Sequence, residues 1–212
     1  MTTAPIRFDP GGLEAALAAL NAARGLPADD PRRVADSLRG LEELIAAAWP
    51  SPHPRSTPGD RALAELDELL VGAGHADGAA LVREYLAPIA DRLVETILGR
   101  PEERLAAYGS LRPGRENHHL LASLVGEWRD GTVRGRLDER GWGATMGYPG
   151  LVCDRGGEEV AVRVFFSAAL PAHWGRLDAF EGPSYRRILV PVESGDAVEV
   201  CNLYEARADR AG

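Results

Sequence analysis

The stretch Tyr108-Gly109-Ser110-Leu111-Arg112-Pro113-Gly114 decides how this chain is interpreted. It is typical of a short strand that breaks into a loop, because Gly109, Pro113 and Gly114 allow backbone conformations that bulkier residues resist. Successive N–H groups in such a turn can point into one concavity and hold an anion. The stretch therefore predicts an anion-binding loop at the end of a strand.

A second motif follows some seventy residues later: Leu177-Asp178-Ala179-Phe180-Glu181-Gly182, then Tyr185-Arg186-Arg187. It places the carboxylate of Glu181 at the end of a short amphipathic helix, directly before a Gly-Pro break. Burial of that carboxylate against Phe180 and Tyr185 would raise its pKa toward neutral pH, which suits an acid/base. The two motifs together predict a loop that holds an anion facing a single acid/base.

Further motifs occur in a fixed order between these two. They are Asn117-His118-His119-Leu120-Leu121 at the head of an expected helix, Gly131 and Gly135 around a strand, and Gly147-Tyr148-Pro149-Gly150-Leu151 after it. The set, from about Leu105 to Tyr204, resembles the gamma-glutamylcyclotransferase-like (AIG2-like) family, whose members release 5-oxoproline from gamma-glutamyl amines.

The resemblance implies a role for each matching residue. The glutamyl head group would be held by Tyr108, Gly109, Ser110 and Leu111, and Glu181 would be the general acid/base. The hydroxyl groups of Tyr108 and Tyr185 could donate hydrogen bonds to the head group or to Glu181. The family usually has several large apolar residues before its tyrosine, whereas Glu102 to Ala107 precede it here. This departure implies that the first strand is short or lies at a sheet edge.

The expected reaction uses a nucleophile that the substrate itself carries. In a gamma-glutamyl amide the alpha-amine can attack the gamma-carbonyl and close a five-membered ring, with an effective concentration of roughly 10^5 M or more. One carboxylate can take the proton from the ammonium and return it to the leaving amine. We therefore expect a small-molecule gamma-glutamyl substrate, no cofactor and no metal. Whether the loop N–H groups face the alpha-carboxylate or the oxyanion stays open.

The two halves of the chain differ in their apolar periodicity. Residues 1–100 have helical stripes, which predict a small helical bundle of unknown role. The stripes are Leu13 to Ala23, then Val34, Leu38, Leu41 and Ile45, then Leu63, Leu66 and Leu70, then Leu81, Tyr85, Ile89 and Leu93, with Pro88 expected to kink or split the last. The segment from Pro50 to Pro58 is typical of a loop.

Residues 101–212 show strand patterns instead. Strands are predicted for Thr132–Leu137, Val160–Phe166, Arg187–Val192 and Val198–Tyr204, and helices for Leu120–Val125 and Pro171–Phe180. Strands and helices do not alternate regularly, so a mainly antiparallel sheet fits better than a doubly wound one. The chain is thus α+β: a helical bundle followed by a gamma-glutamylcyclotransferase-like mixed, mainly antiparallel β-barrel with a few helices.

The composition of the chain limits the kinds of partner that we expect it to bind. The formal net charge is -8, which argues against sequence-independent binding to nucleic acid or to an acidic membrane. The first residues, Met1 to Arg7, have no apolar signal region and no stretch is long enough to span a bilayer, so we expect a cytoplasmic protein. Cys153 and Cys201 lie among apolar residues, which favours buried thiols over a disulfide or a metal site.

Several alternative interpretations stay open. The fold could serve as a non-catalytic ligand-binding or regulatory module, with the helical half mediating partner binding or self-association, and a homodimer is possible. The same chemistry could also remove a gamma-glutamyl group from a biosynthetic amine. His118 and His119 are adjacent and favour packing over metal binding. Trp142 lines a pocket or fills a barrel end, and Glu127 and Glu205 are interpreted as surface or rim residues.

Overall fold

The computed structural model describes residues 8–27, 30–48, 87–138 and 149–207. The chain divides into two compact units, one ending at Ile97 and the other beginning at Leu98. Some features singled out in the sequence lie outside the described residues. They are the N-terminal Met1 to Arg7, the loop Pro50 to Pro58, the stripe Leu63, Leu66 and Leu70, the residues Leu81 and Tyr85, and Trp142, Gly147 and Tyr148.

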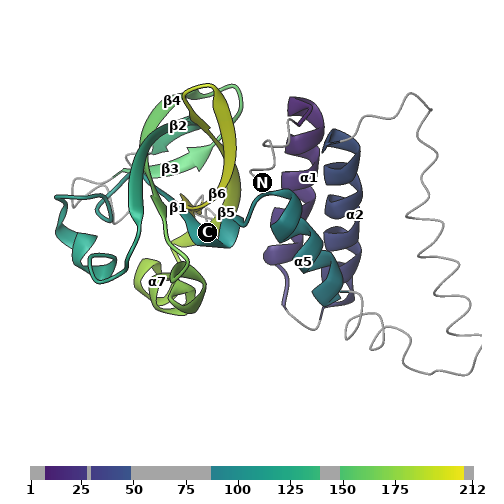
Figure 1. Ribbon diagram of the computed structural model, residues 1–212, viewed down its shortest axis with the longest axis horizontal. Helices are drawn as coiled ribbons and strands as arrows, with labels where there is room; N and C mark the ends of the chain where they lie inside the picture. The colour runs from purple at the N-terminus through teal and green to yellow at the C-terminus, as the bar shows by residue number, and fades with distance from the viewer. Residues whose placement is uncertain (1–7, 28–29, 49–86, 139–148, 208–212) are drawn as a thin grey trace, which may run out of the picture. The chain divides into compact units, whose positions relative to one another are not determined.

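The described part of the first unit is helical, as its periodicity predicts (Figure 1). It contains α1 (Pro10–Arg24), α2 (Pro31–Ala48) and α5 (Ala87–Ile97). Asp9 caps α1, because its carboxylate accepts a hydrogen bond of 2.8 Å from the N–H of Gly12. Pro88 lies in the first turn of α5, where a missing N–H removes no helical hydrogen bond.

The buried face of α2 differs from the predicted stripe. Val34 and Leu41 are buried, but Ile45 is 44% exposed and Leu44 takes its place. The buried positions Val34, Ser37, Leu41 and Leu44 follow a repeat of 3.5 residues, which is the repeat of helices that pack along one another. Likewise, α5 buries Ala90 and Val94 and exposes the predicted Ile89 and Leu93. The helices were predicted at the right places, but part of each stripe was assigned to the wrong face.

The second unit is a closed β-barrel. Its strands are β1 (Arg104–Ala107), β2 (Glu127–Asp138), β3 (Gly150–Cys153), β4 (Glu158–Phe166), β5 (Tyr185–Ser194) and β6 (Ala197–Ala206). They are ordered β3-β2-β4-β1-β6-β5, and a further pairing of β2 with β5 closes the barrel. Among the strands that the structure describes, β1 and β6 pair in parallel and the other pairings are antiparallel. The predicted mixed, mainly antiparallel barrel is therefore confirmed.

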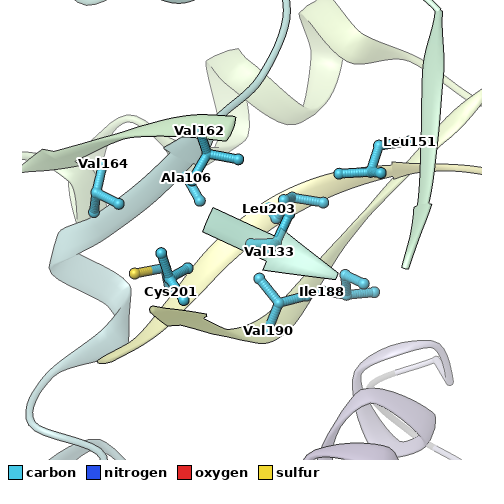
Figure 2. Close-up of a cluster of buried hydrophobic side chains, with 10 residues drawn as sticks. Ala106, Val133, Leu151, Val162, Val164, Ile188, Val190, Cys201 and Leu203 are labelled. Atoms are coloured by element: carbon cyan, nitrogen blue, oxygen red, sulfur yellow. The ribbon is translucent and has the colours of Figure 1, made fainter. Parts of the chain in front are cut away.

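A glycine stands where β2 meets β5. At Gly131 in β2 an added Cβ would lie 2.6 Å from Cγ1 of Val192 in β5, so a side chain there would force one of the strands or Val192 to shift. The barrel interior is filled by aliphatic side chains from all six strands (Figure 2). The buried set is Ala106, Val133, Leu151, Val162, Val164, Ile188, Val190, Val192, Cys201 and Leu203.

Strand β1 separates this interior from a second apolar cluster. Side chains alternate along a strand, so Ala106 belongs to the barrel interior, whereas Leu105 and Ala107 belong to the second cluster. The second cluster also holds Trp174 and Leu177 of helix α7 (Trp174–Glu181). Helix α7 is thereby fixed beside the end of β1, which brings the two sequence motifs together.

Of the two possibilities for the first strand, the structure has the short one: β1 has four residues and lies between β4 and β6 rather than at a sheet edge. One detail of the sequence prediction was wrong. The segment Leu120–Val125 is not a helix. A 3-10 helix, η3, covers Glu116–Leu120 and is followed by turns. The helix predicted for Pro171–Phe180 corresponds to the 3-10 helix η4 (Leu170–Ala172) and to α7.

Candidate active site

A small cavity that opens to solvent lies at the C-terminal end of β1. All six residues singled out in the sequence line it: Tyr108, Gly109, Ser110, Leu111, Glu181 and Tyr185. The described residues Leu105 to Ala107, Pro149 and Tyr204 also line it. The loop after β1 and the end of α7, seventy residues apart in the sequence, thus share one concave site.

The loop begins with a tight turn. The carbonyl oxygen of Gly109 accepts hydrogen bonds from the backbone N–H of Arg112 at 3.4 Å and from its Nε at 3.3 Å. Within the part of the chain that the structure describes, the backbone N–H groups of Gly109, Ser110 and Leu111 donate no hydrogen bond. Three consecutive donors at the cavity wall are therefore available to a ligand.

The two loop glycines play different roles. Gly114 has a φ of +76°, a conformation that favours glycine, as the sequence predicted. Gly109 does not have a positive φ, and a Cβ added there would meet no atom within 4 Å. The backbone therefore does not require glycine at position 109. The missing side chain leaves space in the wall of the cavity instead.

The hydroxyl group of Tyr108 bridges two backbone groups. It donates to the carbonyl oxygen of Tyr204 at 3.0 Å and accepts from the N–H of Leu151 at 3.1 Å. Its single proton is thus engaged, so the expectation that Tyr108 donates to a substrate or to Glu181 does not hold in this arrangement. Burial raises the pKa of Tyr108. Tyr108 shapes the cavity by tying β3 to β6.

Glu181 is the last residue of α7, and Gly182 ends the helix with a φ of +66°. Among the described residues no cation forms a salt bridge with its carboxylate. Burial raises the pKa of Glu181 to about 7. The direction agrees with the sequence prediction, although Phe180, expected to cover Glu181, is itself 43% exposed. A carboxyl group with this pKa can both accept and return a proton near neutral pH.

Tyr185 begins β5 beside Glu181. Burial and, to a lesser extent, the nearby carboxylate of Glu181 raise the pKa of Tyr185, so its hydroxyl keeps its proton. Within the described residues no hydrogen bond engages this hydroxyl group. Unlike Tyr108, Tyr185 therefore has a proton that it can donate in the cavity.

A charged cluster holds α7 against the barrel. Arg187 Nε donates to Asp178 Oδ1 at 3.0 Å, and Arg187 Nη1 donates to Glu102 Oε2 at 3.0 Å. The guanidinium also stacks 4.4 Å over the ring of Trp174. The hydroxyl of Tyr204, which lines the cavity, donates to Asp178 Oδ1 at 2.7 Å. Sequence reasoning missed Tyr204, which has no motif of its own.

Glu205 was wrongly assigned to the surface. Its residue is 4% exposed, and its carboxylate accepts hydrogen bonds from the N–H of Cys153 at 2.9 Å and from Arg186 Nε at 2.7 Å. Burial raises the pKa of the Cys153 and Cys201 thiols to about 12, and both are free cysteines, as predicted. Glu127 is exposed, in line with the sequence.

His118 and His119 lie in η3. The Nδ1 of His118 is 3.3 Å from the carbonyl oxygen of Leu111, and its ring packs 5.6 Å from that of Trp128. The Nδ1 of His119 is 3.0 Å from the carbonyl oxygen of Glu116. Across the described ranges no group of three or more His, Cys, Asp or Glu side chains is arranged to hold a metal ion. No helix in those ranges is long and apolar enough to cross a membrane.

Solved structures similar to this chain cover about half of it. YkqA from Bacillus subtilis is 26% identical with a TM-score of 0.40, over 50% of this chain and 36% of the other. An AIG2-like protein from Mus musculus is 20% identical with a TM-score of 0.41, over 50% and 80%. PH0828 from Pyrococcus horikoshii, described as uncharacterized, is 21% identical with a TM-score of 0.37, over 51% and 81%. This chain thus spans about a third of the length of the Bacillus protein.

No curated protein matches the chain. The sequence model of the family described as Gamma-glutamyl cyclotransferase, AIG2-like matches residues 105–211, which contain the loop, the cavity and Glu181. This match spans half of the chain, and the protein therefore belongs to the gamma-glutamyl cyclotransferase, AIG2-like family.

Proposed function

We propose that this protein is a gamma-glutamyl cyclotransferase, which releases 5-oxoproline from a small gamma-glutamyl amine or peptide. The observation that carries the proposal is a pairing within one cavity. Glu181, a carboxyl group with a pKa of about 7 and no cation partner among the described residues, faces the same space as three unpaired N–H donors. An acid/base and an anion-binding loop are the two parts that the cyclisation needs.

In the proposed reaction the substrate attacks itself. Glu181 takes a proton from the alpha-ammonium, and the amine nitrogen then forms a bond to the gamma-carbonyl carbon and gives up its second proton to solvent. The bond from that carbon to the leaving amine breaks as Glu181 returns its proton to the leaving nitrogen. Of the two protons that the alpha-nitrogen loses, one thus reaches the leaving amine and the other reaches solvent, so atoms and charges balance without a water nucleophile or a nucleophilic side chain. Proton transfer of this kind typically contributes about 10^2 to 10^4 in rate.

In this proposal the loop after β1 binds the anionic group of the substrate. The N–H groups of Gly109, Ser110 and Leu111 would bind the alpha-carboxylate or the oxyanion that forms on the gamma-carbonyl, and the hydroxyl of Tyr185 would donate to the head group. Among the described residues that line the cavity there is no arginine. Within this part of the lining, the groups that would bind a negatively charged ligand group are backbone N–H dipoles.

The test is a direct product assay. The full-length protein is incubated with a panel of gamma-glutamyl amines and dipeptides, and 5-oxoproline is measured by mass spectrometry. We expect release from at least one compound and a loss of about 10^2-fold or more with Glu181→Gln. Wild-type activity in the Glu181→Gln protein would overturn the role of Glu181. Binding of 5-oxoproline without turnover of any substrate would favour the non-catalytic module instead.

A further inference from the structure

The 3-10 helix η3 (Glu116–Leu120) reaches back to the loop that lines the cavity. The backbone N–H of Asn117 donates to the carbonyl oxygen of Ser110 at 3.1 Å. Its side-chain Nδ2 donates to Ser110 Oγ at 2.8 Å. Asn117 therefore forms hydrogen bonds with both the backbone and the side chain of Ser110.

The first of these bonds fixes the direction of a cavity donor. In a trans peptide the C=O of one residue and the N–H of the next point in opposite directions, and the described residues contain no cis peptide. With the carbonyl of Ser110 turned toward Asn117, the N–H of Leu111 must point away from Asn117. That N–H donates no hydrogen bond within the described part of the chain, and both residues line the cavity.

The second bond acts on the hydroxyl group. Because Ser110 Oγ accepts from Asn117, the hydroxyl proton of Ser110 stays available to another acceptor. The side chain of Asn117 is thus placed to hold Ser110 in one rotamer and to keep a second donor ready at the cavity wall.

We propose that Asn117 is a positioning residue, which holds the Ser110–Leu111 peptide and the Ser110 hydroxyl so that their donors point at an anionic ligand group. The proposal deepens the proposed function and rests on it for the identity of the ligand, a carboxylate on a five-carbon amino-acid skeleton. Asn117 itself does not touch the ligand. Without its side chain the loop would populate other orientations, and the anion would bind more weakly.

The experiment measures binding rather than turnover. The ¹⁵N-labelled full-length protein is titrated with L-5-oxoproline, and the amide signals of Ser110 and Leu111 are followed by NMR. We expect these signals to move in the wild type, and Asn117→Ala to raise the apparent Kd roughly three- to tenfold, as expected for one lost neutral hydrogen bond. If the wild-type signals do not move, or Asn117→Ala binds like the wild type, the proposal is overturned.

A matched control separates positioning from loosening of η3. His119→Ala also removes a side-chain contact within η3, that with the carbonyl of Glu116, but not one that reaches the loop. We expect it to bind like the wild type, and an equal loss in both variants would count against positioning. The Ser110→Ala variant completes a double-mutant cycle. In the Ser110→Ala background, Asn117→Ala should change the Kd less than twofold. If the fold-changes in Kd of the two substitutions multiplied instead, the proposed contact would be contradicted.

The outcome is independent of the product assay. If the wild type released no 5-oxoproline from any compound but its loop amides responded to the ligand, the proposed function would fail and the role of Asn117 would still be decided by the Kd values. If turnover were seen and Asn117→Ala bound normally, the proposed function would stand without the positioning residue.

Discussion

Replacing Glu181 by glutamine should make the protein more stable above neutral pH while removing its proposed activity. Burial raises the pKa of Glu181 from its ordinary 4.5 to about 7. The folded state therefore binds this proton more tightly than the unfolded state, and the wild type loses stability as the pH rises from about 4.5 through about 7. Glutamine is neutral at every pH and does not incur this loss.

The magnitude follows from the two pKa values. At 1.36 kcal/mol per pH unit, the difference between 4.5 and about 7 corresponds to at most about 3 kcal/mol. Glu181 keeps partial contact with solvent, so we expect about 1 to 2 kcal/mol. Below about pH 4.5 the two proteins should differ little.

The assay is urea unfolding at several pH values between 4.5 and 8.5. Tryptophan fluorescence reports on the barrel through Trp128 and Trp174, both in the second apolar cluster. Glu158→Gln, a change at an exposed residue of β4, is the matched control and should show no such gain. A Glu181→Gln protein that is no more stable than the wild type at pH 8 would refute the argument that burial governs this carboxyl group.

Three further outcomes follow from the same geometry. The product assay with the wild type should show kcat/KM rising with pH up to about 7 and then levelling, since the basic form of Glu181 starts the reaction; a profile that is flat between pH 5 and 8 would contradict this. Tyr108→Phe should lower the free energy of unfolding by roughly 1 to 3 kcal/mol, because the backbone groups of Leu151 and Tyr204 lose their hydrogen-bond partner. An unchanged urea unfolding curve would show that these two hydrogen bonds do not stabilise the fold. Gly109→Ala should unfold like the wild type, since the added methyl meets no atom within 4 Å, yet raise KM several-fold; unfolding at clearly lower urea would show that position 109 needs glycine for the fold.

The amino-acid sequence was enough to predict much of the local structure. Strand periodicity located β2, β4, β5 and β6, and the Gly-Pro break after Glu181 placed that residue at a helix end. These signals are local, because side-chain alternation and turn chemistry act over a few residues. The order of the motifs was enough to indicate the family before the barrel was seen.

Only the tertiary structure decided the environment of each side chain. Glu205 looks like any glutamate at a strand end, and it is buried because the N–H of Cys153 and the guanidinium of Arg186 satisfy it. The hydroxyl proton of Tyr108 is not free to donate to a ligand, because β3 and β6 engage this hydroxyl group. Burial and hydrogen-bond partners depend on which distant strands meet, and pairings such as β1 with β6, nearly a hundred residues apart, leave no periodic signal in the chain.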